Sequence, residues 1–241
     1  EVMSRHDSHH ELTDRPFLYR LLQRVVRMLL SILAHLEVEG LENLPPCGPY
    51  MLISNHLHWL DPPVIFAVLP ARATVFAAEK WEHRPVIGQL LAWVGNAIFV
   101  RRGEVDRKAL RQALNVLSSG GILGIAPEGT RSKTGGLQRG RDGPAYLAAR
   151  SGVPIVPMVV SGQEKLFPSL LRWRRATVHV VVGKPFTLPE SARHARSTEL
   201  DVWTHHIMLS MARLLPPQYR GVYAEEVERT TNQPTGESAS K

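Results

Sequence analysis

The segment SNHLHWLDPP, residues 54–63, joins a predicted strand to a predicted helix. The apolar run that ends at Met51-Leu52-Ile53 is typical of a short buried strand. Proline disfavours the helical conformation in the residue before it but suits the first position of a helix, so we expect Asp61 to cap a helix that starts at Pro62. His56 then lies in the preceding loop, which can fold the ring back onto the Asp61 carboxylate. The segment therefore predicts a His–Asp pair at the carboxyl end of a strand, where open α/β sheets place their sites.

The spacing of this pair carries little weight by itself. His9 and Asp14 have the same separation in a polar N-terminal stretch where nothing else indicates a site. The prediction for His56 and Asp61 therefore depends on their strand–loop–helix context and on the polar groups that end later strands of the chain.

Composition limits the function to a few classes. The 241 residues suit one large α/β domain, and the single cysteine, Cys47, excludes an intramolecular disulfide and a cysteine-rich metal site. A net charge of +7 indicates a polyanionic partner, which is nucleic acid, anionic lipid or a phosphorylated substrate. The sequence has no nucleic-acid-binding motif and no phosphate-loop or dinucleotide fingerprint, so we expect neither nucleic acid nor a nucleotide. No metal and no other cofactor is expected either.

The clearest predicted helix covers residues 16–37 and is preceded by a polar segment, 1–15, that we expect to be disordered. Arg20, Arg24 and Arg27 form one basic stripe, while apolar residues cover most of the remaining surface. The helix could pack on the domain core, or it could lie in a membrane interface with its arginines toward lipid phosphates. We favour the interface, because the apolar arc is wider than core packing needs. No apolar run is long enough to span a bilayer.

Residues 38–215 alternate between predicted strands and helices, which is typical of a largely parallel sheet covered by helices. We expect a single-domain αβα sandwich with a largely parallel twisted sheet, preceded by the N-terminal amphipathic helix. The strand at 153–160 contains Pro154 and Pro157 and is expected to be irregular or at an edge. Residues 216–241 are expected to form a flexible tail. The other predicted strands are 36–38, 51–53, 73–78, 97–100, 122–126 and 178–182, and the helices begin at 62, 85, 104, 143 and 198.

Polar side chains come directly after three of these strands. Asn55, His56 and Asp61 come after the first, Arg101 and Arg102 after the second, and Glu128, Thr130 and Arg131 after the third. Such strand ends converge on one edge of a parallel sheet. Each group alone has an ordinary explanation as a solvated strand end or a turn. Together they supply a base, its orienting carboxylate and several cations, which suits acyl transfer onto a phosphorylated alcohol.

Four blocks between residues 50 and 185 resemble the glycerophospholipid acyltransferases of the bacterial lysophosphatidic acid acyltransferase type. They are Asn55-His56-x4-Asp61, the stretch from Gly95 to Arg102, Pro127-Glu128-Gly129-Thr130-Arg131-Ser132, and Val153-Pro154-Ile155-Val156-Pro157. Gly183-Lys184-Pro185 resembles the closing turn of that family. One position departs from it, because His58 stands where the family often has serine.

The resemblance implies a role for each matched residue. His56 would be the general base and Asp61 would orient its imidazole, as in a serine triad without the serine. Arg102 and Arg131 would bind the acceptor phosphate through bidentate contacts. Glu128, Gly129 and Thr130 would form the same substrate pocket, and Pro157 would line the acyl or glycerol site. Arg139 is a weaker candidate, and Asn55 is expected to fix the loop.

The implied function is transfer of a fatty acyl group from acyl-CoA or acyl-carrier protein to the free hydroxyl of 1-acyl-glycerol-3-phosphate, giving phosphatidic acid. The acceptor could instead be another lysophospholipid, glycerol-3-phosphate or an amino-lipid. A catalytically inactive lipid-binding scaffold is the third alternative, and the intact His56 and Asp61 argue against it. The expected location is the cytoplasmic face of an anionic membrane, as a peripheral or monotopic protein.

Overall fold

The computed structural model describes residues 16–101, 106–194 and 196–232. The expected disordered segment 1–15 and Arg102 lie outside these residues.

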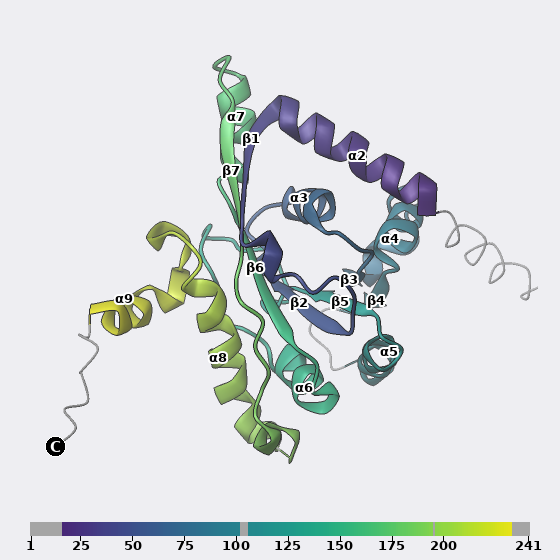
Figure 1. The fold of residues 1–241 in the computed structure, drawn as a ribbon, viewed down its shortest axis with the longest axis vertical. Helices are drawn as coiled ribbons and strands as arrows, with labels where there is room; N and C mark the ends of the chain where they lie inside the picture. The colour runs from purple at the N-terminus through teal and green to yellow at the C-terminus, as the bar shows by residue number, and fades with distance from the viewer. Residues whose placement is uncertain (1–15, 102–105, 195, 233–241) are drawn as a thin grey trace, which may run out of the picture.

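The domain is built on one twisted sheet with the strand order β1-β7-β6-β2-β5-β3-β4 (Figure 1). All pairings are parallel except that of β6 with β7, so β1 and β7 run opposite to the other five strands. This confirms the predicted α/β class with a largely parallel sheet. The strands are β1 (Ala34–Glu39), β2 (Tyr50–Ser54), β3 (Thr74–Ala78), β4 (Ile98–Val100), β5 (Ile122–Ile125), β6 (Ile155–Ser161) and β7 (Ala176–Val182).

Helices cover both faces of the sheet, and each face has its own apolar core (Figure 1). One core contains residues of α2 (Pro16–Leu33) and α3 (Asp61–Val68). The other contains residues of α5 (Arg107–Ser118), α6 (Asp142–Ser151), α8 (Leu200–Ala212) and the C-terminal segment that comes after α8. A further helix, α4 (Ile87–Gly95), precedes β4.

The N-terminal helix is shorter than predicted, since α2 ends at Leu33 and the next six residues form β1. The predicted end at 37 was wrong because Ala34–Glu39 pairs in parallel with β7 along its whole length. The strand predicted at 36–38 is confirmed as β1, which begins two residues earlier and so ends the helix sooner than its apolar pattern indicates. Among the described residues, no helix is both long and apolar enough to cross a membrane.

Only part of the α2 surface packs on the domain. Leu30 is buried, Val26 is partly buried, and the Gln23 amide donates to the carbonyls of Phe66 and Leu69 at the end of α3. Leu22 is partly buried too, but most of the other large apolar side chains of α2 are exposed, as are its arginines. The exposed apolar set is Phe17, Leu18, Leu21, Val25, Met28, Leu29, Ile32 and Leu33.

The strand that carries Pro157 is not at an edge, so that prediction was wrong. β6 lies between β2 and β7, and all seven of its residues are buried. Proline is accepted here because the antiparallel ladder with β7 covers only residues 158–161, while the Pro157 carbonyl accepts a hydrogen bond from Gly183 N at 2.8 Å. Proline has no amide hydrogen to donate, and at position 157 this donor is not needed because the residue lies just outside the ladder with β7.

The predicted flexible tail was also wrong for residues 216–232. Two short 3-10 turns, Pro217–Tyr219 and Gly221–Tyr223, lead into α9 (Ala224–Asn232). Tyr219, Tyr223 and Val227 are buried against the core on the α8 face. These three side chains supply apolar burial that the polar composition of the segment hides.

Candidate active site

The Asp61 carboxylate is held at the point where β2 ends and α3 begins. Its Oδ2 atom lies 3.1 Å from His56 Nδ1 and accepts a hydrogen bond from His58 N at 2.8 Å. Its Oδ1 atom accepts one from Gln163 Nε2 at 2.6 Å. Asp61 is not the N-cap that we predicted, because Leu60 occupies that position and Asp61 is the first helical residue. The carboxylate binds His56 and Gln163 instead of capping α3.

This arrangement sets the tautomer and direction of the His56 ring. The carboxylate accepts from Nδ1, so Nδ1 carries the proton and Nε2 remains to accept one from a substrate. The Asp61 side chain is 2% exposed and that of His56 is 23% exposed. A buried orienting carboxylate beside a partly exposed imidazole is the arrangement that general-base catalysis requires.

The backbone of His56 is fixed by the loop after β5. His56 N donates to Glu128 Oε1 at 3.0 Å, and the His56 carbonyl accepts from Ser132 N at 2.8 Å. Glu128 Oε2 accepts from the backbone N of Gln138 at 2.9 Å. Burial raises the pKa of the Glu128 carboxyl, and the hydrogen bonds from His56 and Gln138 partly oppose that rise. Glu128 therefore positions the backbone of His56 by linking it to the loop after β5.

Asn55 fixes the other side of the junction, as predicted. It is buried, its Nδ2 donates to the Val160 carbonyl, and its Oδ1 accepts from Val160 N, both at 2.8 Å. These two bonds extend the β2–β6 pairing beyond Ser54. The end of β2 is thus anchored before the chain reaches His56.

The loop from Pro127 to Arg141 presents a basic surface next to this junction. Arg131, Lys133, Arg139 and Arg141 are exposed, and the loop closes where Arg141 N donates to the Pro127 carbonyl at 2.9 Å. Gly129 has φ +67°, and a Cβ there would come within 2.8 Å of the Arg141 side chain. A glycine at 129 therefore lets the Arg141 side chain lie against the loop backbone.

The structure leaves the substrate roles of the other predicted site residues untested. Arg102 lies outside the described residues, and its neighbour Arg101 donates to Glu79 Oε2 at 3.0 Å. Pro157 is buried in β6, opposite Ile53 of β2, so its contacts in the structure are packing contacts. Its role toward substrate, like those of Arg102, Thr130 and Arg131, stays a prediction.

Sequence reasoning missed Gln163. It begins a 3-10 turn two residues after β6 ends at Ser161, and it is fully buried. Its position resembles that of the predicted groups, because it is a polar residue directly after an apolar strand. The signal that indicates the polar residues after β2, β4 and β5 is therefore present after β6 as well.

His58 also has a structural explanation. Its backbone N–H holds Asp61, and its ring Nδ1 accepts a long contact of 3.4 Å from Leu60 N. The backbone bond to Asp61 does not depend on the side chain at position 58. This explains why histidine fits where the family that the sequence resembles often has serine.

Two surface pairs show that distance alone does not define the site. His179 Nδ1 lies 3.0 Å from Glu37 Oε2, and His205 Nε2 lies 2.8 Å from Glu226 Oε2. In both pairs the carboxylate is about half exposed, whereas Asp61 is buried and held by two further donors. Burial and fixed orientation distinguish the pair at 56 and 61.

A polar cleft of about 940 Å³ lies along β3, β4 and α5, with Thr74, Glu79, Asn96, Arg101 and Lys108 in its lining. The lining includes neither His56 nor Asp61. The cleft and the His–Asp pair are therefore separate features of the described structure.

Comparison with known proteins places this geometry in a family. The human 1-acyl-sn-glycerol-3-phosphate acyltransferase alpha is 30% identical over 157 residues, which are 60% of this chain and 53% of that protein. The Saccharomyces cerevisiae 1-acyl-sn-glycerol-3-phosphate acyltransferase is 30% identical over 179 residues, 70% of this chain and 56% of that protein. The chain thus spans about half the length of these relatives.

The fold has a solved counterpart as well. The crystal structure of a 1-acyl-sn-glycerophosphate acyltransferase, PlsC, from Thermotoga maritima superimposes with a TM-score of 0.63. It covers 92% of this chain and 83% of its own, at 22% identity, so it supports the fold alone. The family model described as Acyltransferase matches residues 35–161, which is more than half of the chain and runs from the second residue of β1 to the end of β6. The chain belongs to the Acyltransferase family.

Proposed function

We propose that the chain is an O-acyltransferase that transfers a fatty acyl group from acyl-CoA or acyl-carrier protein to the free hydroxyl of 1-acyl-glycerol-3-phosphate. Phosphatidic acid and a free thiol are the products. The observation that carries the proposal is the buried Asp61 carboxylate 3.1 Å from His56 Nδ1, which leaves Nε2 for the acceptor hydroxyl. The names of the relatives supply the acceptor.

His56 acts as general base in this proposal. Its Nε2 takes the proton of the acceptor hydroxyl while the hydroxyl oxygen attacks the thioester carbonyl carbon. The tetrahedral intermediate then collapses, the C–S bond breaks, and the imidazolium returns the proton to the departing thiolate. Asp61 stabilises the imidazolium while it exists, with its own charge held by His58 N and Gln163.

Arg131 and Arg102 bind the acceptor phosphate in this proposal. The exposed charged residues of the Pro127–Arg141 loop, namely Arg131, Lys133, Arg139 and Arg141, are all basic. The loop also holds the backbone of His56 through Glu128 and Ser132. A phosphate bound by its arginines therefore lies on the same rigid unit as the base, which favours a fixed distance between phosphate and reacting hydroxyl.

We place the protein on the cytoplasmic face of an anionic membrane, with α2 in the interface. The support is the exposed apolar set of α2 together with Arg20, Arg24 and Arg27. Apolar side chains enter the acyl boundary and arginines meet lipid phosphates in such helices.

Thiol release with acyl-CoA or acyl-carrier protein and a panel of acceptors tests the chemistry. The panel contains lysophosphatidic acid, other lysophospholipids, glycerol-3-phosphate and an amino-lipid. His56→Ala is expected to lower turnover by about 10²–10⁴-fold, which is the usual contribution of a positioned general base. Vesicle binding should remain.

His179→Ala is the matched control, because His179 also pairs through Nδ1 with a carboxylate 3.0 Å away. It should turn over like the wild type. Retained turnover in His56→Ala would remove His56 as the base, and no thiol release from the wild type with any donor and acceptor would overturn the enzymatic function.

A further inference from the structure

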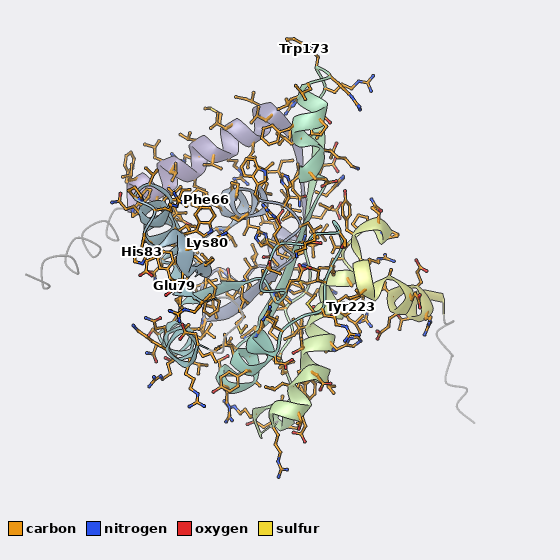
Figure 2. All side chains as sticks on the ribbon, turned by 180° about the vertical axis from the view of Figure 1, so that it is seen from behind. Phe66, Glu79, Lys80, His83, Trp173 and Tyr223 are labelled. Carbon is orange, nitrogen blue, oxygen red and sulfur yellow. The ribbon has the colours of Figure 1, made fainter. Side chains whose placement is uncertain are left out.

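The connection between β6 and β7 ends in a basic and apolar tip, residues 165–175, which we call the 165–175 tip. It contains α7 (Leu166–Leu170) and reads KLFPSLLRWRR, with four basic residues and no acidic one. Trp173 is 99% exposed, Leu171 85% and Phe167 48%. Figure 2 shows Trp173 at the far end of the molecule, away from the body of the domain. Large apolar side chains in such a position are unusual for a surface that meets only water.

The backbone at Trp173 makes this exposure harder to explain by folding. Trp173 N donates to the Leu170 carbonyl and Arg174 N to the Ser169 carbonyl, which is the bond pattern that closes a helix with a left-handed residue. Trp173 occupies that left-handed position with φ +56°. Glycine is the residue favoured there, and a bulky side chain is strained. The tryptophan therefore stabilises neither the turn nor a core.

The 165–175 tip lies at the same edge of the sheet as His56 and the end of α2. It leaves β6 at the carboxyl end, the edge at which β2 delivers His56, and returns into β7. The Arg175 side chain donates to the carbonyls of Ser31 and Ala34, which links the tip to the end of α2. Figure 1 shows α7 beside this end of α2.

Aromatic rings connect the tip to the active-site loop. Phe167 stacks on Trp59 with ring centroids 5.7 Å apart and 19° between the planes, and Trp59 contacts His58 with centroids 5.6 Å apart. Trp59 is itself exposed. A continuous row of rings thus runs from the tip to the residues beside His56.

We propose that the 165–175 tip inserts into the surface of an anionic bilayer as a second contact beside α2. Trp173 and Leu171 enter the headgroup and acyl boundary, while Lys165, Arg172 and Arg174 meet lipid phosphates. The charge selects this partner over a second copy of the chain, since two wholly basic tips repel each other. The inference rests on the membrane association proposed above and adds the surface that turns the His56 edge of the sheet toward the lipid.

Vesicle sedimentation of the full chain without acyl donor tests the inference. The vesicles are phosphatidylcholine alone or phosphatidylcholine with phosphatidylglycerol. Trp173→Gly is expected to bind the anionic vesicles about tenfold more weakly than wild type, because one large apolar contact with the lipid is lost. Its unfolding temperature should be equal or higher, because glycine fits the left-handed position. Trp173→Phe should recover most of the binding.

Wild-type affinity in Trp173→Gly would overturn the inference, as would equal wild-type binding to neutral and anionic vesicles. A change in oligomeric state on size exclusion, with vesicle binding unchanged, would make the tip a protein contact and overturn it too. Failure of the wild type to bind either vesicle would overturn the membrane association as a whole. Thiol release from acyl-CoA, measured on the same preparations, tests the proposed chemistry separately.

Discussion

The Asp61 carboxylate receives hydrogen bonds from residues that come from separate parts of the chain. His56 and His58 approach from the loop after β2, and Gln163 approaches from the turn after β6. A carboxylate that accepts several directed bonds has little freedom to rotate, so it holds the imidazole in one direction. The direction of the His56 ring thus depends on Gln163, which lies 102 positions from Asp61 in sequence.

Gln163→Met replaces the buried amide with an apolar side chain of similar length and removes the 2.6 Å bond to Asp61. We expect the turnover number to fall about tenfold or more, since a hydrogen bond to a charged group contributes about 1.5–3 kcal/mol. The acceptor KM should change little, because the Gln163 side chain binds the Asp61 carboxylate and not the arginines proposed to hold the phosphate. Steady-state kinetics with lysophosphatidic acid measures both constants.

Asn43→Leu is the control, because it removes a side-chain hydrogen bond to Val182 at the opposite edge of the sheet. It should lose stability without losing turnover. If both variants keep wild-type turnover, Gln163 has only a structural role.

Sequence reasoning reached the pair at 56 and 61 because a strand end and a proline-fixed helix start are local signals. It placed Asp61 wrongly as the N-cap, because local propensity cannot show that Leu60 occupies that position and that Asp61 instead meets His56 and Gln163. The position of Gln163 after β6 is a local signal, but its bond to Asp61 is not, because Asp61 follows another strand. Pairings between distant strand ends are set by sheet order, which one sequence does not reveal.

At the scale of elements, the C-terminal segment locks the loop that carries the arginines. Leu137 N donates to the Tyr219 carbonyl, Val222 N donates to the Leu137 carbonyl, and Gly140 N donates to the Tyr223 hydroxyl. The Tyr219 hydroxyl donates to Glu164 Oε1 at 2.6 Å, next to Gln163. Burial, together with Glu164, raises the pKa of Tyr219 to about 12. The segment therefore braces the two structures that hold His56 and Asp61.

Gly221→Ala tests this bracing. Gly221 has φ +54°, and a Cβ there would overlap the Leu137 carbonyl. The left-handed conformation alone costs alanine about 1–2 kcal/mol, so with the overlap we expect the free energy of unfolding to fall by at least about 2 kcal/mol. The acceptor KM should rise as the arginine loop moves. Denaturant unfolding and steady-state kinetics measure the two effects.

The matched control is Gly120→Ala. Gly120 has φ +80°, but a Cβ there meets nothing within 4 Å. It should lose less than Gly221→Ala, namely the cost of about 1–2 kcal/mol for the conformation alone, and keep its acceptor KM. Equal losses of unfolding free energy in the two variants would mean that the added Cβ at 221 does not disturb Leu137. The contact between Gly221 and Leu137 would then not brace the loop.

Elements with a clear period were predicted and those that depend on partners were not. The amphipathic pattern of α5 and the apolar runs of β2 and β5 gave their positions directly. The end of α2 was missed because Ala34–Glu39 pairs with a strand about 140 residues later. β6 was misplaced because Pro157 lies just outside its ladder with β7 and Pro154 lies before the strand begins. The C-terminal segment was missed because its packing on the core depends on three buried side chains in a mostly polar stretch, Tyr219, Tyr223 and Val227.

On the scale of the whole molecule, most of the exposed large apolar side chains lie on α2 and on the 165–175 tip, next to Trp59. A smaller group, Val86, Ile87 and Leu90, lies at α4, and Leu41, Val202 and Val222 are exposed singly. Figure 1 shows α8 and α9 on the side of the sheet away from α2. This asymmetry supports the proposal that one side of the molecule, which adjoins the His56 edge, faces the lipid.

Two contacts on one rigid body should act together on a membrane, because the first to bind raises the local concentration of lipid around the second. Met28→Ser with Ile32→Ser removes two side chains that are 56% and 60% exposed on α2. We expect anionic-vesicle affinity to fall about tenfold or more, and adding Trp173→Gly should abolish measurable binding.

Val202→Ser is the control, because it removes an equally exposed side chain, 62%, from the α8 side and should bind like the wild type. Sedimentation at low and high salt measures all four proteins, and high salt should weaken binding by screening the arginines. A loss of binding in Val202→Ser as large as in the α2 variant would contradict a single lipid-facing side.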